Sequence, residues 1–164
     1  MNWLASPGWR MGLVLALADL LTLLPGPALF VALKPFWLGL LVIWLALEHP
    51  ARGTLGFVFL VGLGADLLLG TWFGEHALRL LVIAFIVRRF RSRLRFFPLW
   101  QQSLAVGALL FNDRVVIIML RSFVSPMVPE WSFWLPALSG MLLWPLLFLV
   151  VDDLGRRLRS RPDR

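Results

Sequence analysis

Cysteine is absent from the 164-residue chain, and charged residues make up only 15% of it. Without cysteine there is no disulfide framework, no thiolate metal site and no cysteine nucleophile. Ordinary soluble domains carry ~25% charged residues. The scarcity of charge therefore argues against an ordinary soluble fold.

Apolar residues fill the sequence instead: 60% of the chain is hydrophobic, and the mean hydropathy is +0.83. A soluble domain of this size buries only part of its surface and could not hide so much apolar area. Lipid as the solvent removes that problem. We therefore expect a membrane protein.

Six apolar segments are candidate membrane-spanning helices, at residues 11–33, 36–49, 53–70, 76–88, 100–120 and 133–152. A bilayer core needs ~20 apolar residues per helix, so 36–49 and 76–88 are short for a full span. Pro25, Gly26 and Pro27 should end or kink the first segment. We expect an all-α bundle of about six transmembrane helices, with one multi-pass domain over 1–155 and a basic cytoplasmic tail over 156–164.

Ten of the sixteen basic residues lie in two short runs that each follow an apolar segment: Arg88, Arg89, Arg91, Arg93 and Arg95, then Arg156, Arg157, Arg159, Arg161 and Arg164. This is the positive-inside pattern, which holds basic loops in the cytoplasm. Six crossings would place both runs and both termini there. We expect solvated charge that sets the topology, with added attraction to anionic headgroups. The position of these residues does not favour nucleic-acid binding.

Several charged residues lie within the apolar segments, where each costs ~2.5–3.5 kcal/mol. From the helical rise, Asp66 and Arg114 lie about 21 Å from the cytoplasmic ends of their segments, and Arg79 about 13 Å. Asp113 shares the level of Arg114, but adjacent residues cannot face each other on a helix. We expect a buried charge cluster in the outer half of the membrane, in which Asp66 or Asp113 pairs with Arg79 or Arg114.

The surroundings of Asp66 are rich in glycine. Gly62, Asp66 and Gly70 are spaced four apart and share one helix face, and glycine there lets another backbone approach closely. Gly70, Trp72 and Gly74 belong to the outer turn that follows. The face is therefore an internal joint between helices, or a surface that meets a partner or a ligand.

No pattern of catalytic residues is evident. No serine has a nearby base and orienting group of the kind that nucleophilic catalysis requires. His49 and His76 are expected at opposite membrane faces, where they cannot share a metal and are solvated loop residues. We expect no enzyme activity, no metal and no cofactor.

Several short patterns, taken in order along the chain, resemble the MreD family of bacterial rod shape-determining membrane proteins. They are Lys34-Pro35-Phe36-Trp37, Trp44, His49, Gly56-Phe57, Gly62, Asp66-Leu67, Gly70, Gly74, Leu99-Trp100-Gln101-Gln102 and Leu143-Trp144-Pro145. The resemblance runs over almost the whole chain, and the length and hydropathy of the chain agree with it.

The resemblance implies a non-enzymatic scaffold or regulator in the bacterial inner membrane, within the cell-elongation machinery that builds side-wall peptidoglycan. The implied direct partner is MreC, a bitopic membrane protein. MreB, the RodA glycosyltransferase and a penicillin-binding transpeptidase are implied indirectly. The implied fold is similar to the six-helix substrate-binding subunits of energy-coupling-factor vitamin transporters.

Two functions follow from joining the resemblance to the residues. In the first, the face with Gly62, Asp66 and Gly70 and the adjoining turn 71–75 hold the transmembrane helix of an MreC-like partner. In the second, the chain is a small-molecule-binding transport subunit whose buried charges line a ligand cavity. The transport function predicts an outward-open, water-filled pocket at the level of Asp66. The scaffold function predicts that this level is closed, with an apolar partner groove elsewhere.

Overall fold

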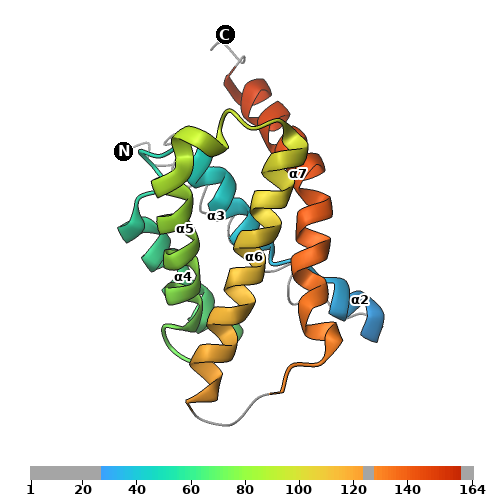
Figure 1. Ribbon diagram of the computed structural model, residues 1–164. Coiled ribbons are helices and arrows are strands. Elements are labelled where there is room, and N and C mark those ends of the chain that lie inside the picture. Colours follow the sequence, from blue (N-terminus) through green and yellow to red (C-terminus); the bar gives the residue numbers. More distant parts are fainter. Residues whose placement is uncertain (1–26, 124–127, 160–164) are drawn as a thin grey trace.

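The computed structural model describes residues 27–123 and 128–159, and the regular elements in these ranges are all helical (Figure 1). In chain order they are α2 (Ala28–Leu33), α3 (Trp37–Glu48), α4 (Leu55–Leu69), α5 (Glu75–Leu94), α6 (Leu99–Ser122), the 3₁₀ helix η2 (Trp131–Trp134) and α7 (Leu135–Arg159). The all-α prediction is confirmed for these residues.

Most predicted segments correspond to one helix each. Segments 36–49, 53–70 and 100–120 match α3, α4 and α6 to within two residues at each end. Of the first segment, 11–26 lies outside the described residues, and α2 begins directly after Pro27. The proline therefore marks a helix start, which agrees with the break expected there.

The prediction that the fourth segment ends at residue 88 is wrong. Helix α5 continues to Leu94 and carries Arg91 and Arg93 in its last turn. Arginine is a good helix former, and cations are favourable at the carboxyl end of a helix because they face its negative dipole end. The basic run therefore extends the helix instead of forming a loop.

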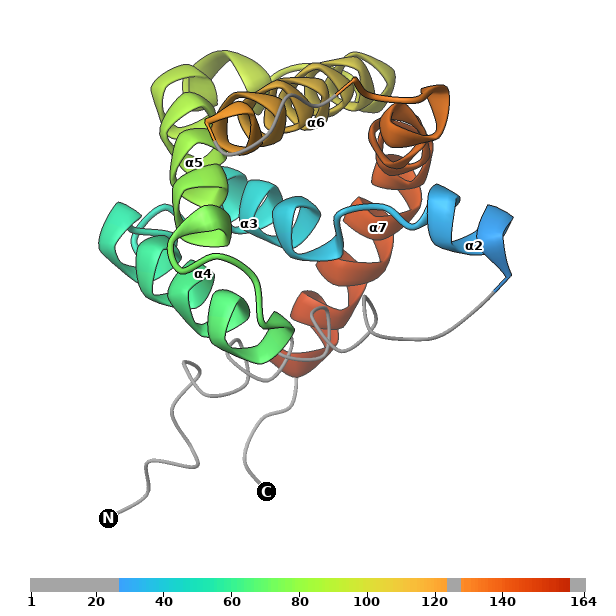
Figure 2. The same ribbon diagram turned by 90° about the horizontal axis from the view of Figure 1, so that it is seen from below.

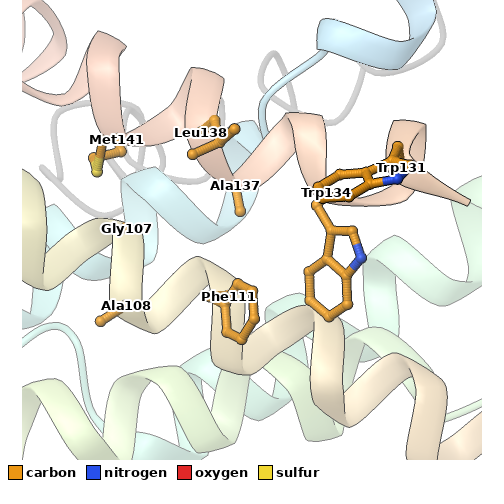
Figure 3. Close-up of a pocket in the computed structure, with 8 residues that line it drawn as sticks. All are labelled: Gly107, Ala108, Phe111, Trp131, Trp134, Ala137, Leu138 and Met141. Atoms are coloured by element: carbon orange, nitrogen blue, oxygen red, sulfur yellow. The ribbon is translucent and has the colours of Figure 1, made fainter. Parts of the chain in front are cut away.

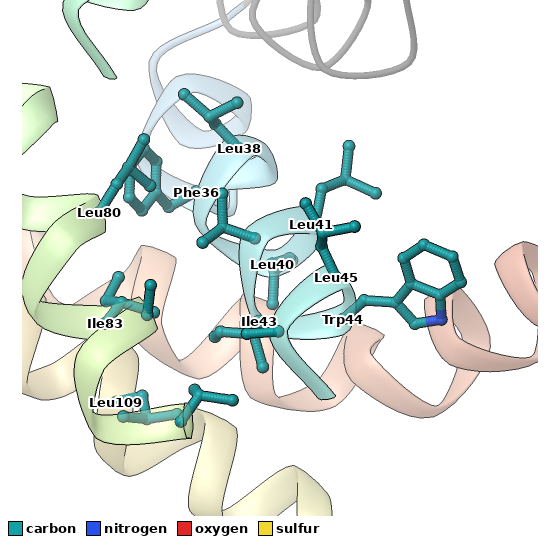
Figure 4. Packing of buried hydrophobic residues seen from close by; sticks show 14 of the residues in the cluster. Phe36, Leu38, Leu40, Leu41, Ile43, Trp44, Leu45, Leu80, Ile83 and Leu109 are labelled. Carbon is teal, nitrogen blue, oxygen red and sulfur yellow. The ribbon is translucent and has the colours of Figure 1, made fainter. Parts of the chain in front are cut away.

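Helix α3 lies at the centre of the bundle. Every residue from Leu38 to Leu47 is buried, and the helix contacts α5, α6 and α7. Figure 2 shows it enclosed by the other helices. A helix that is apolar on all sides is expected in such a position. The core around it combines Leu40 and Ile43 of α3 with Leu80 and Ile83 of α5 (Figure 4).

Arginines of α5 hold the carboxyl end of α3. Arg88 Nη1 donates to the carbonyl oxygens of Pro50 and Gly53 at 2.8 and 2.7 Å, and Arg91 Nε donates to that of Leu47 at 2.7 Å. The last carbonyls of a helix lack intrahelical partners. The expectation that Arg88 and Arg91 serve only as solvated charge is therefore wrong.

The other arginines of the two runs that the structure describes lie near the carboxyl ends of α5 and α7. Arg89, Arg93 and Arg95 are exposed. Helix α7 continues through Arg156, Arg157 and Arg159, so the first part of the predicted tail is helical. The carboxyl ends of α5 and α7 lie at the same end of the bundle (Figure 1).

Three helical stretches within the described residues are long and apolar enough to cross a membrane: Val31–Glu48, Leu99–Ser122 and Trp131–Val151. The first includes the break between α2 and α3. Helix α4 is apolar but shorter, and α5 carries Glu75, Arg79 and its arginine run. Length and composition thus support a membrane protein, and the number of six crossings stays a prediction.

Candidate functional site

Gly62 forms the closest approach between α4 and α5. A Cβ atom at this position would overlap the Cα of Ala77 and lie 2.7 Å from its backbone nitrogen. Because backbone atoms cannot swing aside as side-chain ends do, a residue with a Cβ would force the helices apart. The face that carries Gly62 and Asp66 is therefore an internal joint.

Gly70 does not belong to that joint, although the four-residue spacing predicted it. It ends α4 in the left-handed conformation, with φ 62° and ψ 28°, and a Cβ there would meet nothing within 4 Å. Gly74 has φ 96° and precedes α5. Glycine adopts these angles without the steric cost that other residues have, so the two glycines shape the turn. Trp72 between them is 51% exposed.

Asp66 caps the start of α5 from the preceding helix. Its Oδ2 accepts the backbone N–H of Gly74 at 2.8 Å, and its Oδ1 accepts that of His76 at 2.9 Å. The first N–H groups of a helix have no intrahelical acceptor, and a negative charge is favourable at that end of the helix dipole. Gly74 has no side chain to act as a cap, and Asp66 takes this role.

His76 is buried beside Asp66, so the expectation of a solvated loop histidine is wrong. It is 7% exposed, and its Nδ1 lies 2.9 Å from Asp66 Oδ1. Its Nε2 lies 3.4 Å from Arg79 Nη1. Since arginine can only donate, the arrangement fits a neutral ring with the proton on Nδ1. Helix α5 begins at Glu75, so His76 belongs to its first turn and not to the preceding loop.

Arg79 and Asp113 form a buried ion pair, one of the four pairings that the sequence left open. Arg79 Nε lies 2.8 Å from Asp113 Oδ1, and Arg79 Nη2 lies 2.7 Å from Oδ2. The two residues are 5% and 1% exposed. This is the bidentate geometry in which arginine binds carboxylates most strongly. The guanidinium also lies 4.4 Å from the ring centroid of Phe36.

Glu75 and Arg121 extend the cluster toward the end of α6. Arg121 Nη2 donates to Glu75 Oε1 at 3.1 Å, and the same oxygen lies 3.7 Å from Arg79 Nη1. Arg121 is not among the residues predicted for this site. It lies eight residues after Asp113, so both project from the same face of α6, and that spacing is the signal that could have found it.

The polar cluster thus links α4, α5 and α6 through Asp66, His76, Arg79 and Asp113. The residue types of a nucleophilic triad also meet here, because Thr71 Oγ1 lies 2.8 Å from Asp66 Oδ1 and 3.1 Å from His76 Nδ1. A triad needs the nucleophile and the carboxylate on different ring nitrogens. Here both contact Nδ1, so the geometry is that of a structural hydrogen-bond network.

A second polar link joins two of the patterns that carried the family resemblance. Gln102 Nε2 donates to the carbonyl of Leu94 at the end of α5 at 3.1 Å. Trp144 Nε1 of α7 donates to Gln102 Oε1 at 3.4 Å. Trp144 is fully buried, so a buried amide ties three helices together.

Arg114 lies apart from the polar cluster. Its guanidinium lies 5.1 Å from the ring centroid of Phe133 in η2. Within the described part of the chain, no carboxylate is within 4.0 Å of it and its side chain makes no hydrogen bond. Asp113 and Arg114 therefore have different surroundings, as their adjacent positions on a helix predicted.

An apolar hollow of about 520 Å³ lies between α6 and α7, away from the polar cluster. It is lined by Gly107, Ala108, Phe111, Trp131, Trp134, Ala137, Leu138 and Met141 (Figure 3). The rings of Phe111 and Trp134 are stacked with centroids 4.5 Å apart. We call this hollow the α6–α7 groove.

Among the described residues, no group of three or more histidine, aspartate or glutamate side chains is arranged to hold a metal ion. The members of the polar cluster bind one another and the first turn of α5. The arrangement therefore fixes three helices relative to one another.

Comparison with known proteins agrees with the resemblance seen in the sequence. The family model described as rod shape-determining protein MreD matches residues 7–153. The rod shape-determining protein MreD of Haemophilus influenzae is 35% identical over 143 residues, which cover 87% of this chain and 88% of the relative. No solved structure matches the chain, so the similarity to energy-coupling-factor subunits stays a prediction.

Proposed function

The chain belongs to the MreD family of rod shape-determining proteins, and from this we propose that it is a non-enzymatic scaffold or regulator of the cell-elongation complex. In this role it binds an MreC-like bitopic protein directly. Through that partner it acts alongside MreB, RodA and a penicillin-binding transpeptidase in peptidoglycan synthesis.

We place the protein in the bacterial inner membrane with six crossings and both termini in the cytoplasm. The support is the position of the basic runs, since the ends of α5 and α7 share one end of the bundle (Figure 1). The turn 70–74 and η2 then belong to the outer side. The polar cluster lies in the outer half of the membrane under this topology.

The observation that carries the scaffold proposal is the closed state of the polar cluster. Asp66, Arg79 and Asp113 are each at most 5% exposed, and their polar atoms bind one another or backbone N–H groups. A transport subunit would need a water-filled pocket at this level. The α6–α7 groove lies away from this level and is lined by apolar residues, so it is not the water-filled pocket that the transport alternative requires.

The partner surface is best sought on the outward face of α4, opposite the joint with α5. Gly56, Leu60, Gly64 and Leu68 follow one another at four-residue intervals and form one face. Leu60 and Leu68 are exposed, and a Cβ on Gly56 or Gly64 would meet nothing within 4 Å. Glycine costs a helix about 1 kcal/mol relative to alanine. A partner helix packed closely on these glycines would account for them.

Co-purification of the detergent-solubilised protein with its MreC-like partner tests the proposal. Gly64→Leu adds bulk in open space, so the protein should fold, and we expect at least about tenfold less partner, equivalent to about 1.4 kcal/mol. Leu104→Phe adds bulk at an exposed position of α6 and should leave recovery unchanged. Asp66→Leu is a poor probe because it removes the cap of α5.

Two different outcomes test the α4 partner surface and the scaffold function separately. Equal recovery with Gly64→Leu would show that α4 is not the partner surface. Failure of the wild-type protein to retain the partner at all would contradict the scaffold proposal itself.

A further inference from the structure

Among the arginines of the outer half, Arg114 is the one that no carboxylate of the described residues contacts within 4.0 Å. Arg79 has Asp113, and Arg121 has Glu75. The contact of the Arg114 guanidinium among the described residues is the ring of Phe133, whose centroid lies 5.1 Å away. A ring face occupies one side of the guanidinium plane, whereas its five N–H donors point within that plane. These donors are therefore available to an anion.

The α6–α7 groove leads to this arginine. Gly107, Phe111 and Arg114 lie on adjacent turns along one side of α6, because residues three and four apart are neighbours on a helix. Phe111 stacks on Trp134, and Trp134 packs edge-on against Phe133, with centroids 5.4 Å apart. The guanidinium therefore lies at the η2 end of the apolar groove.

The depth of Arg114 suits a headgroup. It lies eight residues before Ser122, the last residue of α6, which corresponds to about 12 Å along the helix axis. Arginine side chains extend toward the membrane surface from such depths while their stems stay in apolar surroundings. Trp131, at the same end, is 90% exposed, as tryptophans at a membrane interface are.

We propose that the α6–α7 groove binds one phospholipid with an anionic headgroup. The phosphate accepts hydrogen bonds from Arg114, and an acyl chain lies against Ala108, Leu138 and Phe111. Arginine and phosphate form charge-assisted, often bidentate hydrogen bonds. This site does not depend on the partner proposed above, and it gives the groove a ligand from the bilayer itself.

The shape of the groove favours an acyl chain over a partner helix. Gly107 is not open to a second backbone, because a Cβ there would lie 2.7 Å from the sulfur of Met141. The space over that glycine is therefore already filled by a flexible side chain. A partner helix would also have to bring an acidic residue into the membrane, at ~2.5–3.5 kcal/mol. A lipid phosphate is present at the headgroup level without that cost.

Native mass spectrometry of the full-length protein in a mild detergent tests the proposal. The protein is incubated with phosphatidylglycerol or phosphatidylethanolamine of the same acyl composition, and the bound fraction of each is measured. We expect the wild type to retain phosphatidylglycerol preferentially. Arg114→Gln should lower its retention at least about tenfold, the effect of losing one charge-assisted hydrogen bond.

Matched control variants test whether a loss of lipid comes from the groove or from any change of charge or bulk on the protein surface. Arg89→Gln makes the same charge change at an exposed position at the other end of the bundle and should leave retention unchanged. Ala108→Phe fills the groove and should lower the retention of both lipids, whereas Leu78→Phe adds the same kind of bulk at an exposed position of α5 and should not. Arg114→Lys keeps the charge without the planar fork and should give intermediate retention of phosphatidylglycerol.

Each contrary outcome overturns the lipid site. Unchanged retention with Arg114→Gln would show that the arginine does not hold the headgroup. If Ala108→Phe leaves the lipids bound but abolishes partner co-purification, the groove holds a partner helix instead. Every variant must have a melting temperature close to that of the wild type. If Arg114→Gln does not fold, the retention of phosphatidylglycerol by Arg114→Lys is the test of the arginine instead.

Discussion

The bidentate pair between Arg79 and Asp113 allows a quantitative test of what holds the three helices together. Removing one partner of a buried ion pair leaves an uncompensated charge, at a cost of about 3–5 kcal/mol. The two single variants should differ in a defined direction. Asp113→Leu leaves Arg79 beside Glu75, at 3.7 Å, and over Phe36, whereas Arg79→Met leaves Asp113 without another ion pair among the described residues. Arg79→Met should therefore be the less stable variant.

The double variant Arg79→Met/Asp113→Leu shows whether the loss of stability comes from the broken ion pair. Replacing both partners by apolar residues of similar size is often neutral or stabilising, so we expect it to recover most of the lost stability. For a chain of this length, each single variant should lower the melting temperature by roughly 6–20 °C. The measurement is thermal unfolding in detergent, followed by far-ultraviolet circular dichroism.

The result that would refute this reasoning is additivity. If the double variant is as unstable as the sum of the two single variants, the side chains do not act as a pair. Arg89→Met is the control, because Arg89 is exposed and its replacement should change stability by no more than about 0.5 kcal/mol.

Two further predictions concern the contacts of α5 with α4 and α3. Gly62→Ala should lower the free energy of unfolding by about 1–3 kcal/mol, because its Cβ would press on the backbone of Ala77. Gly64→Ala should raise the free energy of unfolding by up to about 1 kcal/mol, because alanine has the higher helix propensity. Equal thermal stability of the two variants would contradict the assignment of Gly62 to the joint between α4 and α5. Arg88→Gln should cost about 1.5–3 kcal/mol through lost hydrogen bonds and speed hydrogen–deuterium exchange in the turn after α3, whereas Arg89→Gln should leave both unchanged.

Much of the fold was predictable because membrane helices are strongly marked in sequence. Long apolar runs gave the positions of α3, α4 and α6, since lipid tolerates few alternatives to an apolar helix. The end of α5 was not predictable by the same rule. Arginine is read as a loop signal next to a membrane, but it extends helices well, and here Arg88 and Arg91 also bind carbonyls of another segment.

The site was predictable in part for a related reason. The depth estimate put Arg79 about 13 Å and Asp113 about 21 Å from the cytoplasmic ends of their helices, a difference that a long arginine side chain can span, and charges in lipid must find partners. The role of Asp66 was not accessible from spacing. It depends on the turn formed by Gly70 and Gly74, which brings the N–H groups of α5 back to the carboxylate. The same turn decides that His76 is buried, and no local pattern encodes it.

The contacts at the end of α3 have a consequence for the order in which the protein is made. The carbonyls of Leu47 and Pro50 leave the ribosome before their donors, which follow 44 and 38 residues later in Arg91 and Arg88. Until α5 has been synthesised, the innermost helix has neither its arginine donors nor the α5 side chains that bury it. Helix α3 therefore cannot reach its final packed position before α5 has been synthesised. The most deeply buried of the described helices is thus translated early but packs late.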